Sequence, residues 1–277
     1  MTYHSPLTLL SALEAIKDGI PKKIVAGGTD VYPTMKQGQT PAEFLDVTRV
    51  ADLRTLEHSD AGTRIGAAIT WTEIAKSDLP PAFDALKQAA REVGSIQIQN
   101  AGTIAGNLCN ASPAADGVPP LLALEARVEL ASAERGTRSL PLSDFILGVR
   151  KTAMAADEIV TAVVIPPQDA SSRSSFEKLG SRRYLVISIT MTAAHICLGP
   201  DGRIADAKVA VGACSAVAQR LPALERDLIG KLASEVHVSL AHLAPLSPID
   251  DVRGSGAYRL DVVQAQCERA ILKAARA

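Results

Sequence analysis

The sequence predicts an α+β protein of two domains, on three observations. Short strand and helix patterns follow one another through the first 165 residues. A stretch rich in Pro and Ser then covers residues 166–175, which is typical of a boundary between domains. Beyond it, two strand patterns joined by a Gly-Pro-Asp-Gly turn precede two helical patterns. We therefore expect a mixed domain over residues 1–170 and an antiparallel sheet with helices over residues 171–277.

The composition limits what the chain can do. Its 277 residues are 47% hydrophobic and carry a net charge of −1, so a generally basic nucleic-acid binder is excluded. The four cysteines include no CxxC pair, which argues against a zinc ribbon or an iron–sulfur cluster within this chain. The N-terminus lacks a signal-peptide pattern, and the most apolar stretch, residues 184–198, contains polar residues and is too short to span a membrane. We expect a cytoplasmic protein with no membrane span.

In the first domain, the apolar spacing of Leu9, Leu10, Leu13 and Ile16 predicts a helix, with Ser5 as its N-cap, Pro6 in its first turn and Gly19 as its stop. A second helix is predicted over 82–93 and a short one over 121–124. The predicted strands are 24–26, 44–47, 63–68, 126–130 and 158–165.

In the second domain, the predicted strands are 176–179, 185–198 and 204–212, the last two joined by the turn at 199–202. Helices are predicted over 235–243 and 260–275. One face of the final helix is apolar and should pack on the sheet, through Leu260, Val263, Cys267, Ile271 and Ala274.

A first glycine-rich motif, Gly27-Gly28-Thr29-Asp30, follows the strand at 24–26. Two glycines allow the backbone to approach a ligand closely, with N–H groups directed at an anion. The motif is neither a Walker A loop nor a GxGxxG fingerprint, so neither mechanism applies. The alternative is a tight turn that binds no ligand.

A second polar motif lies in a long run without charged side chains, residues 93–115. We interpret the segment 100–107, Asn-Ala-Gly-Thr-Ile-Ala-Gly-Asn, as a loop whose backbone and amide donors bind a diphosphate. Asp116 would accept hydrogen bonds from sugar-like hydroxyls, unless it only caps the following helix. Two phosphate-type loops in one chain indicate a dinucleotide that spans both.

These motifs, in this order, resemble the FAD-binding subunit of molybdenum-containing hydroxylases, the group that includes xanthine dehydrogenase, nicotinate dehydrogenase and aerobic carbon monoxide dehydrogenase. The resemblance rests on segments spread over most of the chain: 25–30, 99–107, 111–116, 151–152, 158–160, 165–166 and 176–183. It implies an FAD-binding domain of the vanillyl-alcohol-oxidase or PCMH type over residues 1–170, in two parts divided near residue 55. The remainder would be the smaller C-terminal flavoprotein domain.

The resemblance also implies the cofactor-binding residues. The first loop around the FAD diphosphate would be Ile24, Val25, Ala26, Gly27, Gly28, Thr29, Asp30 and Val31. The rest of the diphosphate cradle would be Gly102, Thr103, Gly106 and Asn107. Contacts to the ribityl chain, the ribose or the flavin ring would come from Asn110, Asp116, Ile159, Val160 and Lys178. From the residues alone, an ordinary buried strand is the better interpretation of Ile159 and Val160, and Lys178 suits a solvated surface equally well.

At three positions the sequence departs from the family pattern, so the family's residue roles cannot be assigned there. Gln99 stands where Arg is common, so no ion pair is expected from that position. Ala105 stands where Gly is common, so its backbone needs negative φ or more room. The residues after Arg183 include no acid where many relatives carry one.

Among other candidates, Cys109 is expected to be a packing residue, and His237 and His242 do not form an i, i+4 metal pair.

The function implied is that of an FAD-dependent oxidoreductase subunit that transfers electrons. One partner subunit would hold the molybdenum cofactor, and another would hold two [2Fe-2S] clusters, as a dimer of heterotrimers. FAD would pass electrons to NAD, oxygen or another acceptor. No catalytic or metal-binding residue for substrate hydroxylation is expected in this chain. The alternatives are a stand-alone flavin-dependent reductase or oxidase on the same fold, and a non-catalytic nucleotide-binding module.

Overall fold

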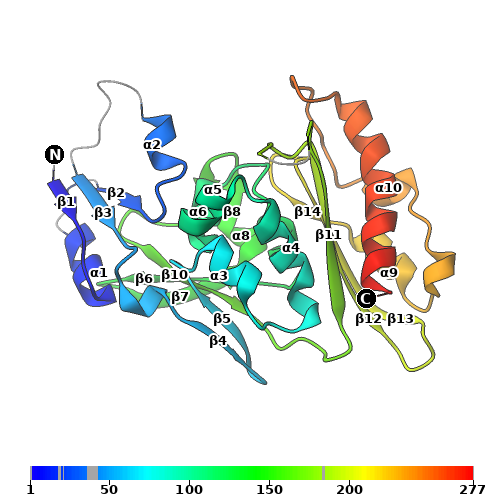
Figure 1. Cartoon of the computed structure of the whole chain (residues 1–277), viewed down its shortest axis with the longest axis horizontal. Coiled ribbons are helices and arrows are strands. Elements are labelled where there is room, and N and C mark those ends of the chain that lie inside the picture. Colours follow the sequence, from blue (N-terminus) through cyan, green and yellow to red (C-terminus); the bar gives the residue numbers. More distant parts are fainter. Residues whose placement is uncertain (1, 18–19, 21, 36–42, 183–184, 277) are drawn as a thin grey trace.

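The computed structural model describes residues 2–17, 20, 22–35, 43–182 and 185–276. Figure 1 shows the elements arranged in successive layers along the long axis of the molecule. A small N-terminal sheet lies at one end, a larger sheet with a group of helices occupies the middle, and a second large sheet with the final helix lies at the other end.

The N-terminal sheet has three parallel strands, with the central strand β3 (Glu43–Asp46) between β1 (Thr2–His4) and β2 (Lys22–Val25). Parallel neighbours need a crossover connection, which α1 (Leu9–Lys17) supplies between β1 and β2. The turn after β2 leads into the one-turn helix α2 (Val31–Thr34). The start of α1 differs from the prediction, because the hydroxyl of Thr8 and not that of Ser5 accepts a first-turn N–H, from Ser11 at 3.2 Å. Gly19 lies outside the described residues.

The middle sheet is antiparallel and has five strands in the order β4-β5-β10-β6-β7. Their bounds are β4 (Leu56–Ser59), β5 (Gly62–Gly66), β6 (Arg127–Ser132), β7 (Gly136–Pro141) and β10 (Ile159–Ile165). The central strand β10 is buried at six of its seven positions, which explains the nearly continuous apolar run of the sequence there.

Short helices cover this sheet. They are η1 (Ala51–Leu53), α3 (Trp71–Lys76), η2 (Pro81–Phe83), α4 (Asp84–Glu92), α5 (Ile96–Ala101), α6 (Ile104–Asn110), α7 (Val118–Ala123) and α8 (Leu142–Phe145). A two-stranded ribbon, β8 (Ile146–Gly148) and β9 (Lys151–Thr152), follows α8.

The C-terminal sheet is antiparallel, in the order β11-β12-β13-β14. Its strands are β11 (Arg173–Leu179), β12 (Thr190–Leu198), β13 (Ile204–Gly212) and β14 (Gln219–Arg220). The helices α9 (Pro222–Leu228), η3 (Ala233–Glu235), η4 (Leu240–Leu243) and α10 (Gly256–Ala274) follow.

The two faces of β12 pack against different layers. Met191 and Ala193 lie in one cluster with Ala85 and Ala89 of α4, whereas Ala194 and Ile196 lie in another with Val263 and Cys267 of α10. Because side chains alternate along a strand, the two layers cover opposite faces of β12, and its first seven residues are buried. The C-terminal sheet is therefore clamped between the helices of the middle layer and α10 (Figure 1).

Several predicted elements need correction. The run 93–115 is not an extended loop, because α5 and α6 occupy most of it, with the hydroxyls of Ser95 and Thr103 as their N-caps. The predicted helix over 235–243 is replaced by two separate 3₁₀ turns. The strand predicted from residue 185 begins at Thr190. The predicted apolar face of α10 is confirmed at its four buried positions, Val263, Cys267, Ile271 and Ala274.

The α+β class is confirmed, with an antiparallel sheet and helices at the C-terminal end. The division of the chain at residue 170 and the further split near residue 55 stay predictions. Within the described residues, no helix is long and apolar enough to cross a membrane.

Candidate cofactor-binding site

A cavity of about 930 Å³ lies between the N-terminal sheet and the middle sheet. Its walls come from α1, the turn after β2, the α5–α6 segment, the β6–β7 turn and the segment that leads into β10. The volume is in the upper part of the range of ligand pockets, and both apolar and polar side chains line it.

Most of the predicted site residues line this cavity. They are Ile24, Ala26, Gly27, Gly28, Thr29, Asp30, Val31, Gly102, Thr103, Gly106, Asn107, Asn110, Ile159 and Val160. Three others do not: Val25 is buried, and Asp116 and Lys178 lie elsewhere in the fold. The sequence analysis missed several lining residues outside the motifs, namely Trp71, Lys22, Lys23, Met154 and Arg150.

The turn after β2 packs backbone to backbone on the end of α5. A Cβ atom at Gly27 would lie 1.8 Å from the carbonyl oxygen of Ala101, so no other residue fits there without moving the backbone. Gly28 adopts φ +68°, a conformation that glycine takes at little cost. The two motifs that the sequence singled out are thus in direct contact and form one wall.

The second motif is the junction between two short helices. The Oγ1 of Thr103 accepts the N–H of Gly106 at 3.1 Å, and a Cβ at Gly102 would lie 2.9 Å from the carbonyl oxygen of Ile98. Trp71, which is fully buried, donates its backbone N–H to the carbonyl of Gly102 at 3.1 Å and fixes the junction from α3. The junction is held by neighbours on both sides, so the wall is rigid.

Two residues of this segment, Ala105 and Gln99, differ from the family pattern, and the structure accommodates both. Ala105 lies inside α6 and is not among the residues with positive φ, as its methyl group requires. The side-chain amide of Gln99 donates to the carbonyl of Arg91 at 2.9 Å. Cys109 also lines the cavity, and burial raises the pKa of its thiol to about 12, so the thiol is protonated at neutral pH.

Asp116 and Lys178 form a buried ion pair. Their side chains are 9% and 7% exposed, and Lys178 Nζ lies 2.8 Å from the Asp116 carboxylate. The Ser188 hydroxyl donates to the other carboxylate oxygen at 2.6 Å, and Lys178 also donates to the carbonyl of Glu92 at 3.0 Å. Burial raises the pKa of Asp116, whereas Lys178 and Ser188 act in the opposite direction.

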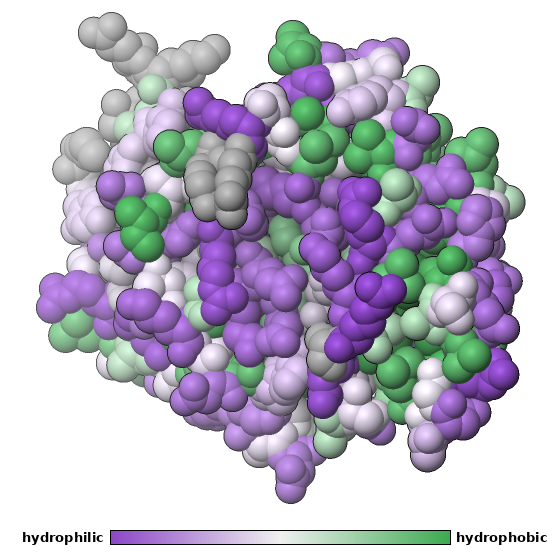
Figure 2. All heavy atoms as spheres, turned by 45° about the vertical axis from the view of Figure 1, so that its right-hand side comes forward, coloured by the Kyte–Doolittle hydropathy of each residue, from purple (hydrophilic) through white to green (hydrophobic). Residues whose placement is uncertain are grey.

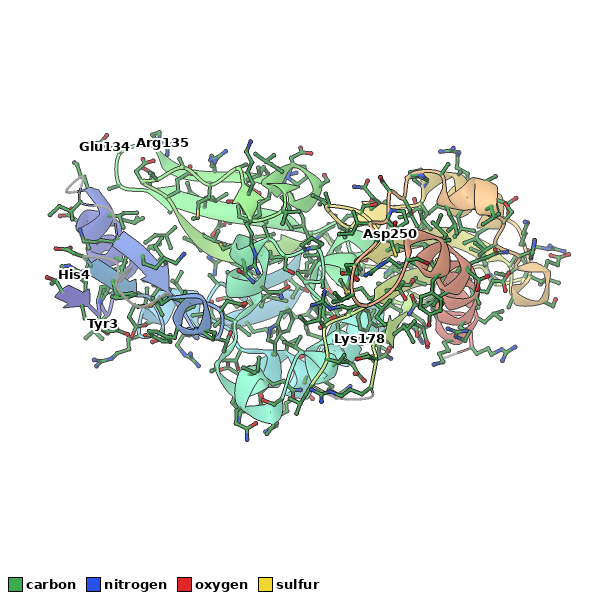
Figure 3. The ribbon with its side chains drawn as sticks, turned by 90° about the horizontal axis from the view of Figure 1, so that it is seen from above. Tyr3, His4, Glu134, Arg135, Lys178 and Asp250 are labelled. Carbon is green, nitrogen blue, oxygen red and sulfur yellow. The ribbon has the colours of Figure 1, made fainter. Side chains whose placement is uncertain are left out.

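This pair settles two alternatives left open by the sequence. Asp116 does not cap α7, whose N-cap is Gly117 with no side-chain hydrogen bond, and Lys178 is not a solvated surface lysine. The pair joins the start of α7 and the end of α4 to β11, and Figure 3 shows Lys178 in the middle of the molecule, between the N-terminal layers and the C-terminal sheet. Lys178 lines a smaller cavity of about 290 Å³ together with Arg182 and Val186.

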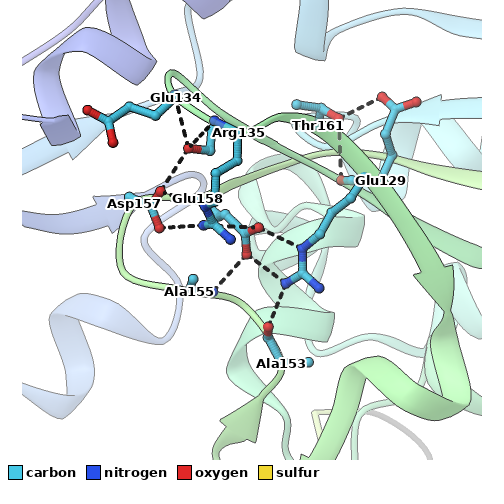
Figure 4. Close-up of polar contacts among 10 residues, drawn as sticks. Glu129, Glu134, Arg135, Ala153, Ala155, Asp157, Glu158 and Thr161 are labelled. Carbon is cyan, nitrogen blue, oxygen red and sulfur yellow. Dashed lines mark hydrogen bonds and ion pairs between the residues drawn. The ribbon is translucent and has the colours of Figure 1, made fainter.

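A second charged network supports the wall that leads into β10 (Figure 4). Glu158 is 2% exposed, and its two oxygens accept from Arg138 at 2.6 and 2.8 Å. The carboxylate also accepts the N–H of Ala155, and Arg138 donates to the carbonyl of Ala153. Both ends of the segment 153–158 are thereby fixed, and this segment continues directly into Ile159 and Val160.

The outer edge of the same wall carries a further ion pair. Asp157 accepts from Ser132 at 2.7 Å and pairs with Arg135 of the β6–β7 turn. Figure 3 shows Glu134 and Arg135 at the end of the molecule where the N-terminal sheet lies. Lys17 at the end of α1 lies 3.4 Å from Glu134, so the turn and α1 meet at this end of the cavity.

Within the described residues, no group of three or more His, Cys, Asp or Glu side chains could hold a metal ion. His237 lies 3.2 Å from Glu268 and His242 lies 3.7 Å from Asp227, so each histidine has its own carboxylate neighbour. The cavity therefore offers backbone donors, amides and apolar walls, which suit an elongated organic ligand with an anionic group.

Two family models match the chain. The FAD binding domain in molybdopterin dehydrogenase matches residues 1–168, and the CO dehydrogenase flavoprotein C-terminal domain matches residues 175–274. Together they cover nearly the whole chain, and the first alone covers more than half of it.

Individual proteins agree with these matches. The nicotinate dehydrogenase FAD-subunit of Eubacterium barkeri is 40% identical over 68% of this chain and 65% of its own length. The nicotine 6-hydroxylase medium subunit of Paenarthrobacter nicotinovorans is 31% identical over 98% of this chain and 96% of its own. A crystal structure of the Cu,Mo-CO dehydrogenase superposes with a TM-score of 0.91 at 24% identity, covering 100% of this chain and 98% of that one. This last likeness concerns the fold.

The network at Glu158 generates a prediction about pH. The Arg138 guanidinium holds the pKa of Glu158 below its usual value of about 4.3, so the ionised carboxylate stabilises the fold above that pH. Glu158→Gln should lower the free energy of unfolding by about 2 kcal/mol at pH 7. The difference from wild type should shrink as the pH falls below about 4, where the wild-type carboxyl is itself protonated. Urea denaturation at several pH values measures this.

The matched control for Glu158 is Glu134→Gln, because Glu134 lies near the same network but is 67% exposed and, among the described residues, pairs only with Lys17. We expect no measurable change in its unfolding midpoint. A pH-independent loss in Glu158→Gln would show that packing rather than charge stabilises the segment.

The Asp116–Lys178 pair generates a second prediction. Asp116→Asn leaves the Lys178 ammonium buried without an opposite charge, which should lower the free energy of unfolding by about 3 kcal/mol. Replacing both partners, as Asp116→Asn with Lys178→Met, should recover most of this loss because no buried charge remains. Denaturation of the FAD-free protein measures both. Equal stability of the single and double variants would mean that the pair is not desolvated in solution.

Proposed function

Because this chain belongs to the family of FAD-binding subunits of molybdopterin dehydrogenases, we propose that it is the electron-transferring flavoprotein of a multi-subunit molybdenum hydroxylase. It takes electrons from two [2Fe-2S] clusters on one partner subunit and delivers them to an acceptor such as NAD or oxygen. A second partner holds the molybdenum cofactor and oxidises the substrate. The assembly is a dimer of such heterotrimers.

The contact between the turn after β2 and the α5–α6 junction is the observation that supports this proposal most directly. A side chain at Gly27 would collide with the backbone of Ala101, and the turn that results presents Gly28 and Thr29 to the cavity beside Gly102. Such a surface of close backbone and few side chains suits a diphosphate. Asn107 lines the same wall, and its Oδ1, an acceptor, is buried without a hydrogen-bond partner among the described residues, so it suits a hydroxyl of the cofactor rather than a phosphate oxygen. The residues present therefore fit FAD.

We assign the cofactor contacts accordingly. The turn 27–29 and the junction 102–107 hold the diphosphate, and Asn110 contacts the ribityl chain or ribose. Ile159 and Val160 border the flavin ring, and the network at Glu158 keeps that border in place. Asp116 and Lys178 lie outside the large cavity, so in this structure their effect on FAD passes through the packing of α7 and β11.

When bound, FAD supplies the capacity to accept electrons singly and release them in pairs. The chain's own residues supply position and exclusion of water. Backbone donors of the two turns orient the diphosphate, and the apolar side chains of Ile24 and Val160 keep water from the interior of the cavity. Hydroxylation of the substrate takes place on the partner that holds the molybdenum cofactor.

The surface offers places for partner subunits to dock. Figure 2 shows apolar side chains in several separate groups among polar ones on one face. In the C-terminal region the large apolar side chains that are at least 45% exposed are Leu185, Ile187, Ile229, Leu240, Ile249, Val252 and Tyr258. Val252 is 99% exposed, which is unusual for a residue whose burial is favourable. Partner subunits would bury such side chains.

Expression of the chain alone tests the subunit role. We expect the purified chain to bind FAD, seen as flavin absorption in the visible range, and to show no hydroxylase activity on purines, N-heteroaromatics or aldehydes. Co-expression with its partners should restore activity, with molybdenum and iron found by metal analysis. Hydroxylation by the isolated chain would favour a stand-alone flavoenzyme, and protein that binds no flavin would favour a nucleotide-binding module.

A carboxylate in the cradle tests the diphosphate assignment. Gly106 is exposed to the cavity, and among the described residues the atom closest to a Cβ there is the Thr103 hydroxyl, at 2.9 Å. This is a side-chain atom that can rotate away, so Gly106→Asp should fold. Its charge should repel the diphosphate and weaken FAD binding more than tenfold, about 1.4 kcal/mol. Titration of the apo protein with FAD measures the Kd.

Gly148→Asp is the matched control for the cradle, because Gly148 has no atom within 4 Å of its Cβ position and does not line the cavity. Its Kd should equal that of wild type. Unchanged FAD affinity in Gly106→Asp would remove the α5–α6 junction from the diphosphate site.

A further inference from the structure

Arg150 occupies a strained position beside the cavity. It has φ +58°, which is uncommon for a residue with a side chain and costs about 1 kcal/mol relative to glycine. Its backbone N–H donates at 2.9 Å to the carbonyl of Ala111, which also has positive φ, +44°. Two such residues in direct contact at the edge of a ligand cavity are a feature that functional sites often show.

The side chain of Arg150 is fixed on α6 and lines the cavity. Its Nη1 donates to the carbonyl of Asn110, at 3.1 Å, and to the side-chain oxygen of the same residue. These contacts hold the guanidinium at the C-terminal end of α6, while the Arg150 side chain stays accessible to solvent. The site thus has a positive charge at a defined place, contributed by a segment 40 residues away in sequence.

Among the described residues, no carboxylate balances the charge of Arg150. Four basic residues of the described part of the chain line the cavity, Lys17, Lys22, Lys23 and Arg150. Lys17 lies 3.4 Å from Glu134 and Lys22 lies 3.1 Å from Glu43. Arg150 and Lys23 form no ion pair with a carboxylate in the part of the chain that the structure describes.

An anionic ligand would supply the opposite charge. The run 93–115, which makes most of the cradle, contains no charged side chain, so the motifs bring no cation to a diphosphate that carries two negative charges. We propose that Arg150 is an FAD-binding residue outside both glycine motifs, which provides a fixed positive charge for the anionic cofactor and orients Asn110 toward it. This inference rests on the proposed function, since it takes FAD as the ligand.

The backbone strain at Arg150 makes the proposal testable. A role in FAD binding and a role in folding predict opposite changes in the melting temperature when Arg150 is replaced by glycine. Arg150→Gly relieves the strain of positive φ, so the FAD-free variant should have a melting temperature equal to or above that of wild type. The same variant should bind FAD about tenfold more weakly, because the guanidinium is lost. If the role of Arg150 were structural, stability and affinity would fall together.

The charge itself is tested with Arg150→Gln and Arg150→Lys, titrated with FAD at two salt concentrations. Arg150→Gln should lose about tenfold in affinity, and its Kd should depend less on salt than that of wild type. Arg150→Lys should retain more affinity, because it keeps the charge. The neighbouring control Lys151→Gln removes the same charge from an exposed residue that does not line the cavity, and its Kd should be unchanged.

Two failures can be told apart. Wild-type protein that binds no FAD contradicts the proposed function. Wild-type protein that binds FAD while Arg150→Gln and Arg150→Gly bind it with the same Kd and salt dependence contradicts this inference alone.

Discussion

The close approach of the turn after β2 to the end of α5 is the constraint on which the site depends. These two segments belong to different layers, the N-terminal sheet and the helices of the middle layer. Their backbones meet at Gly27 and Ala101, where a single methyl group would have to overlap a carbonyl oxygen. Glycine permits the contact because it lacks a Cβ, and the contact sets the position of both turns at once. The wall of the cavity therefore follows from backbone packing rather than from the length or charge of any side chain.

Two ion pairs, each with a buried carboxylate, fix further parts of the structure, one in the cavity wall before β10 and one elsewhere in the fold. Glu158 and Arg138 fix the segment before β10, and Asp116 and Lys178 fix the junction between α7 and β11. Each carboxylate is buried and satisfied by more than one donor, so its removal leaves a partner uncompensated. Burial favours the neutral form of both acids, but the net shift of the pKa differs between them. For Asp116 the effect of burial is the larger one, and for Glu158 the hydrogen bond from Arg138 is the larger one. The pKa of Asp116 is therefore raised, whereas that of Glu158 is lowered. The Glu158 network thus fixes one wall of the cavity, whereas the Asp116–Lys178 pair fixes the contact between the middle layer and the C-terminal sheet.

The amino-acid pattern predicted those turns and strands whose structure depends on neighbouring residues in the sequence. The glycines of 27–28, the turn at 199–202 and strand 204–212 carry their own signals, and most of the residues that the family resemblance implies for the cofactor line the cavity. The two short helices in the uncharged run were missed although Ser95 and Thr103 are good N-caps, because Gly and Asn obscured the pattern. Asp116, Lys178 and Asn110 are each predicted as site residues, but nothing in the sequence indicates which residues pair with one another. Asp116 and Lys178 are 62 residues apart and Asn110 and Arg150 are 40 apart, and only the tertiary fold brings them together.

Among the described residues, buried charged side chains are paired with an opposite charge, whereas Arg150, which is exposed to solvent, is not. Asp116 and Lys178 are almost fully desolvated, and each has the other as its partner, since an isolated charge there would cost several kcal/mol. Arg150 stands at the cavity edge, where solvent replaces the missing counter-charge, so an unpaired cation costs little in the free protein. When an anionic ligand fills the cavity, water leaves and the same guanidinium comes into a medium of lower dielectric constant. Its attraction for a phosphate then becomes stronger than in water. A cradle without charged side chains and a cation held at its edge are therefore complementary: the first allows close approach, and the second supplies the electrostatic attraction.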